Sequence, residues 1–257
     1  MAASIDLNCD MGESFGAWSM GNDAAVLRYV SSANIACGFH GGDPGIMRET
    51  VAAALAHGVA LGAHPGLPDL PGFGRRVMQI TPQEAYDMVV YQVGALAAVA
   101  ASQGARLHHV KAHGALYNMA AKDGALALAI CRAVRDVDRT LVLYGLAGSA
   151  LLTAAEEVGL AAASEVFADR SYQDDGSLTP RSQRGAMIED VSVAVAQVLR
   201  MAGDGKVRSI NGKDVAVRAD TLCIHGDQPD AQAFAQGIKD ALLQAGIRVA
   251  TVSRATR

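Results

Sequence analysis

The chain has 257 residues, 51% of them hydrophobic, and a formal net charge of −4. This composition is typical of a folded protein with a large buried core, and it excludes a disordered chain. The sequence has no basic block of the kind that binds phosphate backbones, so we expect no nucleic-acid partner.

The remaining composition predicts neither a membrane protein nor an oxidising compartment. Residues 1–10 lack a charged segment followed by a long apolar one, so we expect no signal peptide. The longest weakly charged run, residues 89–101, is too short to cross a bilayer. The 4 cysteines are scattered without a C-x-x-C pair, which favours a reduced, cytoplasmic chain.

Short β-branched apolar runs alternate with longer segments of helical spacing along the chain. A helix is predicted from a cap at Asp43 to residues 57–58, and a second helix from a cap at Thr81 to residues 103–104. Further helices are predicted over residues 190–201 and 230–244. The predicted strands are residues 4–8, 33–37, 59–63, 109–112, 140–144, 162–167, 221–225 and 249–252.

Strands that alternate with helices predict an α/β fold with a mostly parallel sheet. Two closures fit this pattern, a (β/α) barrel and an open doubly wound sheet. No linker divides the chain, so we expect one domain over residues 1–257. The Gly-rich, charged stretch 204–214 predicts an excursion, in which Asn211-Gly212 favours a hairpin with a type I′ turn.

Polar clusters follow nearly every predicted strand, always at its carboxyl end. The carboxyl ends of parallel strands lie together at one end of the barrel or sheet, which we call the mouth. We therefore expect these side chains to share a site. Carboxylates and imidazoles there could transfer protons, and a lysine could bind an anion. The clustered residues are Asn8, Asp10, Glu13, His40, Asp43, His64, Lys111, His113, Glu165, Asp169, Arg170, His225 and the Gly226-Asp227 dipeptide.

Several of these residues have a structural alternative. A loop histidine can bond backbone carbonyls, and Asp43 before Pro44 is a natural helix N-cap. The strand cysteines, Cys9, Cys37 and Cys223, fit small buried residues better than nucleophiles. A divalent metal held by Asp10, His40 and His64 stays open, because ligands on different strands leave no spacing signature.

The motifs around these residues carry a resemblance to a known family. Ala112, Gly41 and Leu67 depart from its usual pattern, and Ala112 replaces a proline between Lys111 and His113. The motifs are DLNCDMGESFG at 6–16, NIACGFHGGDP at 34–44, GAHPG at 62–66 with GFGRR at 72–76, KAHGALYN at 111–118, EVFADR at 165–170 with LTPR at 178–181, and IHGD at 224–227. In these stretches the chain resembles the LamB/YcsF family over nearly its whole length.

The resemblance implies a deformed, TIM-like (β/α) barrel of the glycoside hydrolase/deacetylase type. It also implies ATP-dependent opening of 5-oxo-L-proline to L-glutamate, together with 5-oxoprolinase subunits B and C. ATP would be a co-substrate shared with those partners, because this chain has no Walker motif. The residues assigned to catalysis are Asp10, His64, Lys111, His113 and Asp169, and those assigned to substrate binding are Asn8, Glu13, His40, Asp43, Glu165, Arg170, Arg181 and His225.

Two hypotheses divide the chemistry among these residues. Lys111, with Arg170 or Arg181, would take the anionic groups of substrate and phosphate. Asp10 or Asp169, paired with His64 or His113, would handle protons. Two other interpretations stay open: a metal-dependent amidohydrolase or carbohydrate deacetylase, and a chain that binds substrate while its partners do the chemistry.

Overall fold

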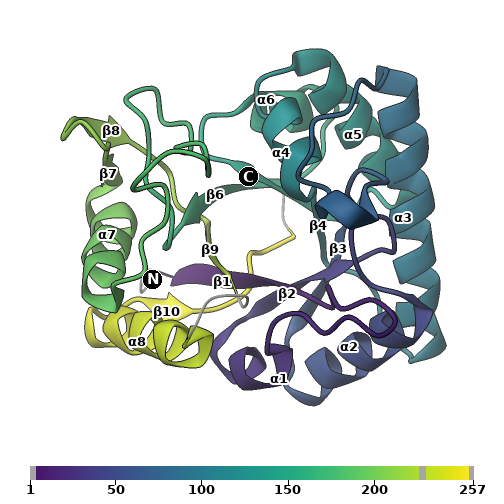
Figure 1. Cartoon of the computed structure of the whole chain (residues 1–257), viewed down its shortest axis with the longest axis horizontal. Helices are drawn as coiled ribbons and strands as arrows, with labels where there is room; N and C mark the ends of the chain where they lie inside the picture. The colour runs from purple at the N-terminus through teal and green to yellow at the C-terminus, as the bar shows by residue number, and fades with distance from the viewer. Residues whose placement is uncertain (1–3, 226–229, 255–257) are drawn as a thin grey trace.

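Seven buried strands run parallel and close on themselves, which confirms the barrel and excludes the open sheet. The structure is a computed structural model and describes residues 4–225 and 230–254. We call each strand of the barrel a stave. The last stave, β9, pairs with β6 on one side and with β1 on the other. Helices lie outside this ring (Figure 1). The staves are β1 (Ser4–Met11), β2 (Ser32–Ala36), β3 (Ala60–His64), β4 (His109–Lys111), β5 (Val142–Leu146), β6 (Ala162–Phe167) and β9 (Thr221–His225).

The eighth predicted strand, residues 249–252, is not a stave of this barrel. Only β10 (Arg248–Val249) pairs there, against the first residues of β1. The segment that follows crosses the amino end of the barrel, where His108 Nε2 contacts the Val252 carbonyl at 3.0 Å. Arg254 donates to the Leu107 carbonyl at 2.8 Å in the same region. The chain therefore uses these residues to close one end of the barrel rather than to form a strand.

The helices begin at the predicted caps. Asp43 accepts from the Gly45 and Ile46 amides, and Thr81 forms a capping box with Glu84. The helices are α1 (Asp23–Val26), α2 (Pro44–Ala56), α3 (Pro82–Ser102), α4 (Gly114–Ala120), α5 (Gly124–Val137), α6 (Ala150–Glu157), α7 (Val191–Asp204) and α8 (Ala231–Gln244), with 3-10 turns η1 (Leu27–Tyr29) and η2 (Leu70–Gly72).

Helix α3 is longer than the apolar run in its sequence. It has 21 residues and, within the part of the chain that the structure describes, is the one helix apolar enough to cross a membrane by length and composition. The run 89–101 is only part of this helix, which reaches spanning length because it also includes residues 82–88 and 102. One face of α3, with Val89, Val93 and Leu96, is buried and packs toward α2, α5 and β3. Burial against the barrel accounts for the apolar character of that face.

The predicted excursion forms a hairpin of different geometry. Strands β7 (Lys206–Arg208) and β8 (Asp214–Ala216) pair antiparallel, so the hairpin is confirmed. A type I′ turn needs positive φ at both central residues, but only Gly212 of the Asn-Gly pair has it, at 82°. The connection instead takes residues 209–213, with Gly212 donating to the Ser209 carbonyl. The type I′ prediction is therefore wrong.

Buried polar side chains fill part of the barrel interior and fix its staves. The His109 ring stacks on Tyr144 with centroids 4.1 Å apart. Its Nε2 donates to Asn34 Oδ1 at 2.8 Å, which joins β4 to β2. Gly62 on β3 faces this ring so closely that a Cβ there would overlap its atoms. The absence of a side chain at Gly62 is thus what lets the ring occupy the interior.

The Gly62 contact gives a test of the packing. We expect Gly62→Ala to lower the free energy of unfolding by about 1–3 kcal/mol or more, because the clamped His109 ring must move. Gly94→Ala in α3 is the matched control, since a Cβ there meets nothing within 4 Å. It should raise stability by about 0.5–1 kcal/mol through helix propensity. Urea unfolding of both variants checks the pair, and equal effects would contradict the described interior.

Candidate active site

The closed barrel brings the predicted polar residues together at the carboxyl ends of its strands. They form three groups. The imidazole cluster is Glu13, His40, His64 and His113. The lysine cluster is Lys111 with Asn8, Asp10 and Glu165. The third group is the Asp169–His225 pair with Arg181.

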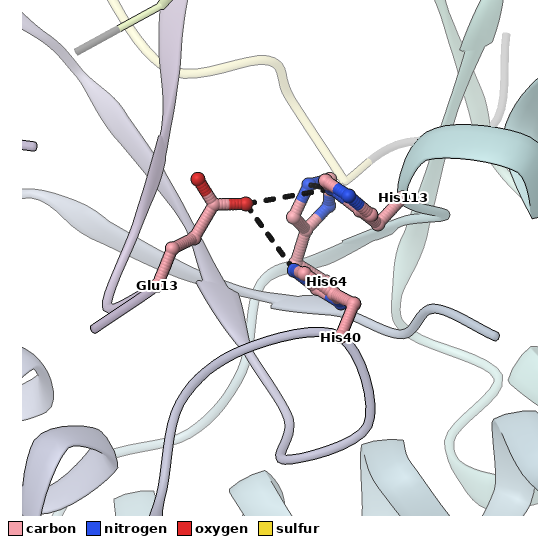
Figure 2. Close-up of side chains that lie close together, drawn as sticks. All are labelled: Glu13, His40, His64 and His113. Atoms are coloured by element: carbon pink, nitrogen blue, oxygen red, sulfur yellow. Dashed lines mark hydrogen bonds and ion pairs between the residues drawn. The ribbon is translucent and has the colours of Figure 1, made fainter. Parts of the chain in front are cut away.

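The imidazole cluster gathers side chains from the ends of four successive staves (Figure 2). Glu13 Oε1 lies 3.2 Å from His40 Nε2 and 3.4 Å from His113 Nδ1. His113 Nδ1 also lies 3.0 Å from His64 Nε2. The rings of His40 and His113 stack with centroids 3.6 Å apart. Four potential ligand or proton-transfer groups thus meet at one point.

Burial sets the charge of this cluster. Burial, reinforced by neighbouring imidazoles, holds the pKa values of His40 and His113 well below the ordinary value of a histidine. Burial also raises the pKa of Glu13, although His113 works against it. At neutral pH, His40 and His113 are therefore uncharged and offer lone pairs rather than positive charge.

The lysine cluster is a buried ion network that links three staves. Lys111 Nζ lies 2.8 Å from Glu165 Oε1, 3.0 Å from Asp10 Oδ1 and 3.2 Å from Asn8 Oδ1. Burial alone would lower the pKa of Lys111, but Asp10 and Glu165 raise it well above the ordinary value. The ammonium group therefore stays charged, and two carboxylates already neutralise it. These contacts favour Lys111 as the internal counter-ion of Asp10 and Glu165 over Lys111 as a residue that binds substrate anions.

Asp10 connects the lysine cluster to the imidazole cluster. Its Oδ1 accepts from Lys111, and its Oδ2 lies 3.2 Å from His64 Nε2. Burial works to raise the pKa of Asp10, but the charges of His64 and Lys111 outweigh it and hold the pKa well below the ordinary value. Asp10 is thus an ionised carboxylate at neutral pH.

The third group pairs a carboxylate with an imidazole. Asp169 Oδ2 lies 2.5 Å from His225 Nδ1, and Arg181 Nη2 lies 3.2 Å from His225 Nε2. Burial opposes charge on both partners, but their mutual attraction raises the pKa of His225 and lowers the pKa of Asp169. Because guanidinium only donates, Nε2 must carry a lone pair when Arg181 bonds it. The sequence hypothesis paired Asp169 with His64 or His113, whereas the structure places it against His225.

Two predicted binding residues are engaged by the backbone. Arg170 is buried and donates to the carbonyls of Thr179 and Ala186 at 2.5 and 3.3 Å. Asp43 accepts from the Gly16 amide at 2.9 Å in addition to capping α2. These bonds favour structural roles for both residues, whereas Arg181 is exposed at the same end of the barrel. Gly226 and Asp227 lie outside the described residues.

The structure adds three residues to the site that the sequence did not single out. Asn34 donates to Asn8 Oδ1 and Asp10 Oδ1 at 2.7 and 2.8 Å. Tyr117 donates to Glu165 Oε2 at 2.7 Å. The Phe73 carbonyl contacts His113 Nε2 at 2.8 Å, and Phe73 itself has a left-handed φ of 54°. All three lie inside the family motifs of the sequence, and that position was the available signal.

The fold and the site define a parallel (β/α) barrel with its ionisable groups gathered at the strand carboxyl ends. The LamB/YcsF family model matches residues 5–257, and the chain belongs to this family. A relative from Bordetella pertussis, named as the A subunit of 5-oxoprolinase, is 76% identical over 249 residues, which cover 97% of this chain and 99% of that protein.

Solved structures agree with this assignment. A lactam utilization protein from Thermus thermophilus superposes with a TM-score of 0.91 at 50% identity, covering 96% of this chain and 99% of that one. A family 4 carbohydrate esterase from Streptomyces lividans superposes with a TM-score of 0.50 at 12% identity, covering 98% and 94%. The second likeness concerns the fold alone, and it agrees with the expected deacetylase-type barrel.

The lysine cluster predicts how the protein responds to loss of its buried cation. We expect Lys111→Met to lower the free energy of unfolding by about 3–5 kcal/mol, because Asp10 and Glu165 would stay buried without a counter-charge. The double variant Lys111→Met/Glu165→Gln should recover part of that loss, and exposed Lys122→Met should change little. Urea unfolding measures all three. A Lys111→Met protein of native stability with a raised KM would instead support the anion-binding hypothesis.

The Asp169–His225 pair predicts a pH dependence with a definite sign. A histidine with a raised pKa stabilises the folded state below its unfolded pKa, and this stabilisation is lost as pH rises through the folded pKa. We expect Asp169→Asn to lower the pKa of His225 and to remove this stabilisation at pH values below the unfolded pKa. NMR titration of the histidine ring protons checks the shift, with exposed His57 as the internal control. An unchanged His225 titration would show that the pairing is absent in solution.

Proposed function

We propose that this chain is the A subunit of an ATP-dependent 5-oxoprolinase and that it hydrolyses the lactam of 5-oxo-L-proline to L-glutamate. The observation that carries the proposal is near-full-length similarity to proteins named as the A subunit of 5-oxoprolinase, together with the match to a lactam utilization protein. The polar residues at the barrel mouth supply the acids, bases and cation that this reaction needs.

Lactam opening sets clear chemical requirements. Water must add across the C–N bond, so that the carbonyl carbon takes the hydroxyl and the ring nitrogen takes a proton. A five-membered lactam is an unactivated amide. Transfer of a phosphoryl group from ATP to its oxygen would release ADP and activate the carbon, and inorganic phosphate would leave after water has added. The site then needs a cation for the substrate's anionic groups and a base for water.

Arg181 is our candidate for the anion-binding residue. Lys111 is neutralised by two carboxylates, and Arg170 donates to two backbone carbonyls. Arg181 is exposed and, among the residues that the structure describes, donates to the neutral His225 ring rather than to a carboxylate. An incoming carboxylate or phosphate is a stronger acceptor for guanidinium than an imidazole nitrogen is. Substrate binding would therefore draw Arg181 away from His225.

His225 is our candidate for the general base. Asp169 holds its Nδ1 side at 2.5 Å, which fixes the ring and leaves Nε2 as the acceptor. Release of Arg181 by the substrate would free that lone pair for a water proton. Binding of the substrate and readiness of the base would in this way be coupled. Asp10 with His64, 3.2 Å apart, is the second acid–base pair within reach of the same mouth.

ATP and the other subunits complete the proposal. The chain has no Walker motif, so we assign ATP binding to subunits B and C or to a site shared with them. All four cysteines are free and buried, which suits a reducing cytoplasm.

A reconstituted assay tests the function. We expect glutamate release from 5-oxoproline and ATP only when this chain is combined with subunits B and C. Arg181→Gln should raise the substrate KM at least about tenfold, since a charge-assisted bond is worth about 1.5–3 kcal/mol. His225→Gln should lower kcat by about 10²–10⁴ with a smaller change in KM. Arg48→Gln and His57→Gln, both exposed and on the outer helix α2 or its end, are the matched controls.

The same assay separates catalysis from simple substrate presentation. If the complex turns over normally with His225→Gln, Asp169→Asn and Asp10→Asn, this chain binds substrate and its partners do the chemistry. Glutamate release by the isolated chain without ATP would contradict the ATP-coupled reaction.

A further inference from the structure

We infer that Glu13, His40, His64 and His113 form a binding site for one divalent transition-metal ion of the zinc type. One donor atom from each of the four residues lies within 4.8 Å of the donor atoms of the others. Three imidazoles and a carboxylate are a ligand set that zinc and its neighbours favour. The inference depends on these four side chains and holds whatever reaction the protein catalyses.

Two backbone carbonyls decide which nitrogens can bind the ion. The Lys111 carbonyl lies 2.7 Å from His64 Nδ1, and the Phe73 carbonyl lies 2.8 Å from His113 Nε2. A carbonyl only accepts, so each of these nitrogens carries the ring proton. If both rings are neutral, His64 Nε2 and His113 Nδ1 therefore each carry a lone pair. A bond from the second ring nitrogen to a carbonyl is the usual support of a metal-ligating histidine.

When both rings are neutral, these two lone pairs face each other without a proton to share. His64 Nε2 and His113 Nδ1 lie 3.0 Å apart, with Glu13 Oε1 3.4 Å from the latter. Lone pairs at this separation repel unless a cation lies between them. Two nitrogens about 3 Å apart fit one ion at bonds of about 2.1 Å. The alternative cation is a proton on His64, shared with His113 and Asp10.

His40 is expected to be the weakest ligand. Its Nε2 faces Glu13 at 3.2 Å, but its Nδ1 is buried and has no hydrogen-bond partner among the described residues. The ring is held by its stack on His113 instead of by a bond to its far nitrogen. Without that bond, the ring lacks the added basicity that the other two histidines receive.

A second group of possible ligands, Asp10, Cys223 and His225, fits a cation less well. Lys111 Nζ lies 3.0 Å from both Cys223 Sγ and Asp10 Oδ1. The ammonium charge would repel an ion that bound those two atoms. The ligand sets differ in one testable way, because only this second group contains sulfur.

Metal binding to the purified full-length chain tests the inference without substrate, ATP or partners. After chelator treatment and desalting, we expect calorimetric titration with ZnCl₂ to give one site per chain. Glu13→Gln and His113→Gln should each weaken binding at least about 10–100-fold, and His40→Gln should weaken it least. His57→Gln and Cys223→Ser should bind like the wild type. Melting curves without metal show whether each variant is folded.

Cobalt keeps the test decisive even where a variant fails to fold. Wild-type protein loaded with CoCl₂ should show visible d–d bands without a sulfur-to-cobalt charge-transfer band. A charge-transfer band, or loss of binding in Cys223→Ser, would move the site to the Asp10 group and overturn the inference. Failure of wild-type protein to bind zinc or cobalt more tightly than His113→Gln does would also overturn it, and would assign a proton to His64. None of these outcomes depends on 5-oxoprolinase activity.

Discussion

A buried ammonium group held between two carboxylates is the interaction on which the rest of the site depends. Lys111 on β4 reaches Asp10 on β1 and Glu165 on β6, so one charge ties three staves at the end where the chemistry collects. Such a network is costly to desolvate and strongly destabilising to break, which makes its geometry hard to alter. Asp10 then presents its second oxygen to His64, and the imidazole cluster takes its position from that contact. The Lys111 carbonyl orients the same His64 ring from the other side.

Charge is divided between two sides of the mouth. The imidazole cluster is dominated by neutral rings and a carboxylate, which suits a cation. The Asp169–His225 pair lies beside an exposed guanidinium, which suits an anion. A substrate with a carboxylate at one end and a carbonyl at the other could bridge the two, with the ionised Asp10 between them. This polarity would fix the direction in which a small asymmetric ring enters.

The sequence was sufficient for the seven barrel strands, for four of the helices and for the clustering of polar residues at strand ends. Periodicity and caps such as Asp43 and Thr81 are local signals, and they located α2 and α3 correctly. The contact partners of these side chains could not be predicted from the sequence. Asp169 and His225, for example, are 56 positions apart and meet only because β6 and β9 pair. For the same reason Lys111 was interpreted as a free cation. Asn34, alone between apolar neighbours on β2, gave no local hint that it faces the interior.

The segment after β10 crosses the amino end of the barrel and is tied there at Val252 and Arg254. These contacts hold the segment over that end of the barrel, whereas the ionisable groups of the site lie at the opposite, carboxyl end. We expect substrate and product to use this carboxyl end, where the ionisable groups lie. A partner that delivers a short-lived activated substrate would then dock at this end, and while docked it would also control product release.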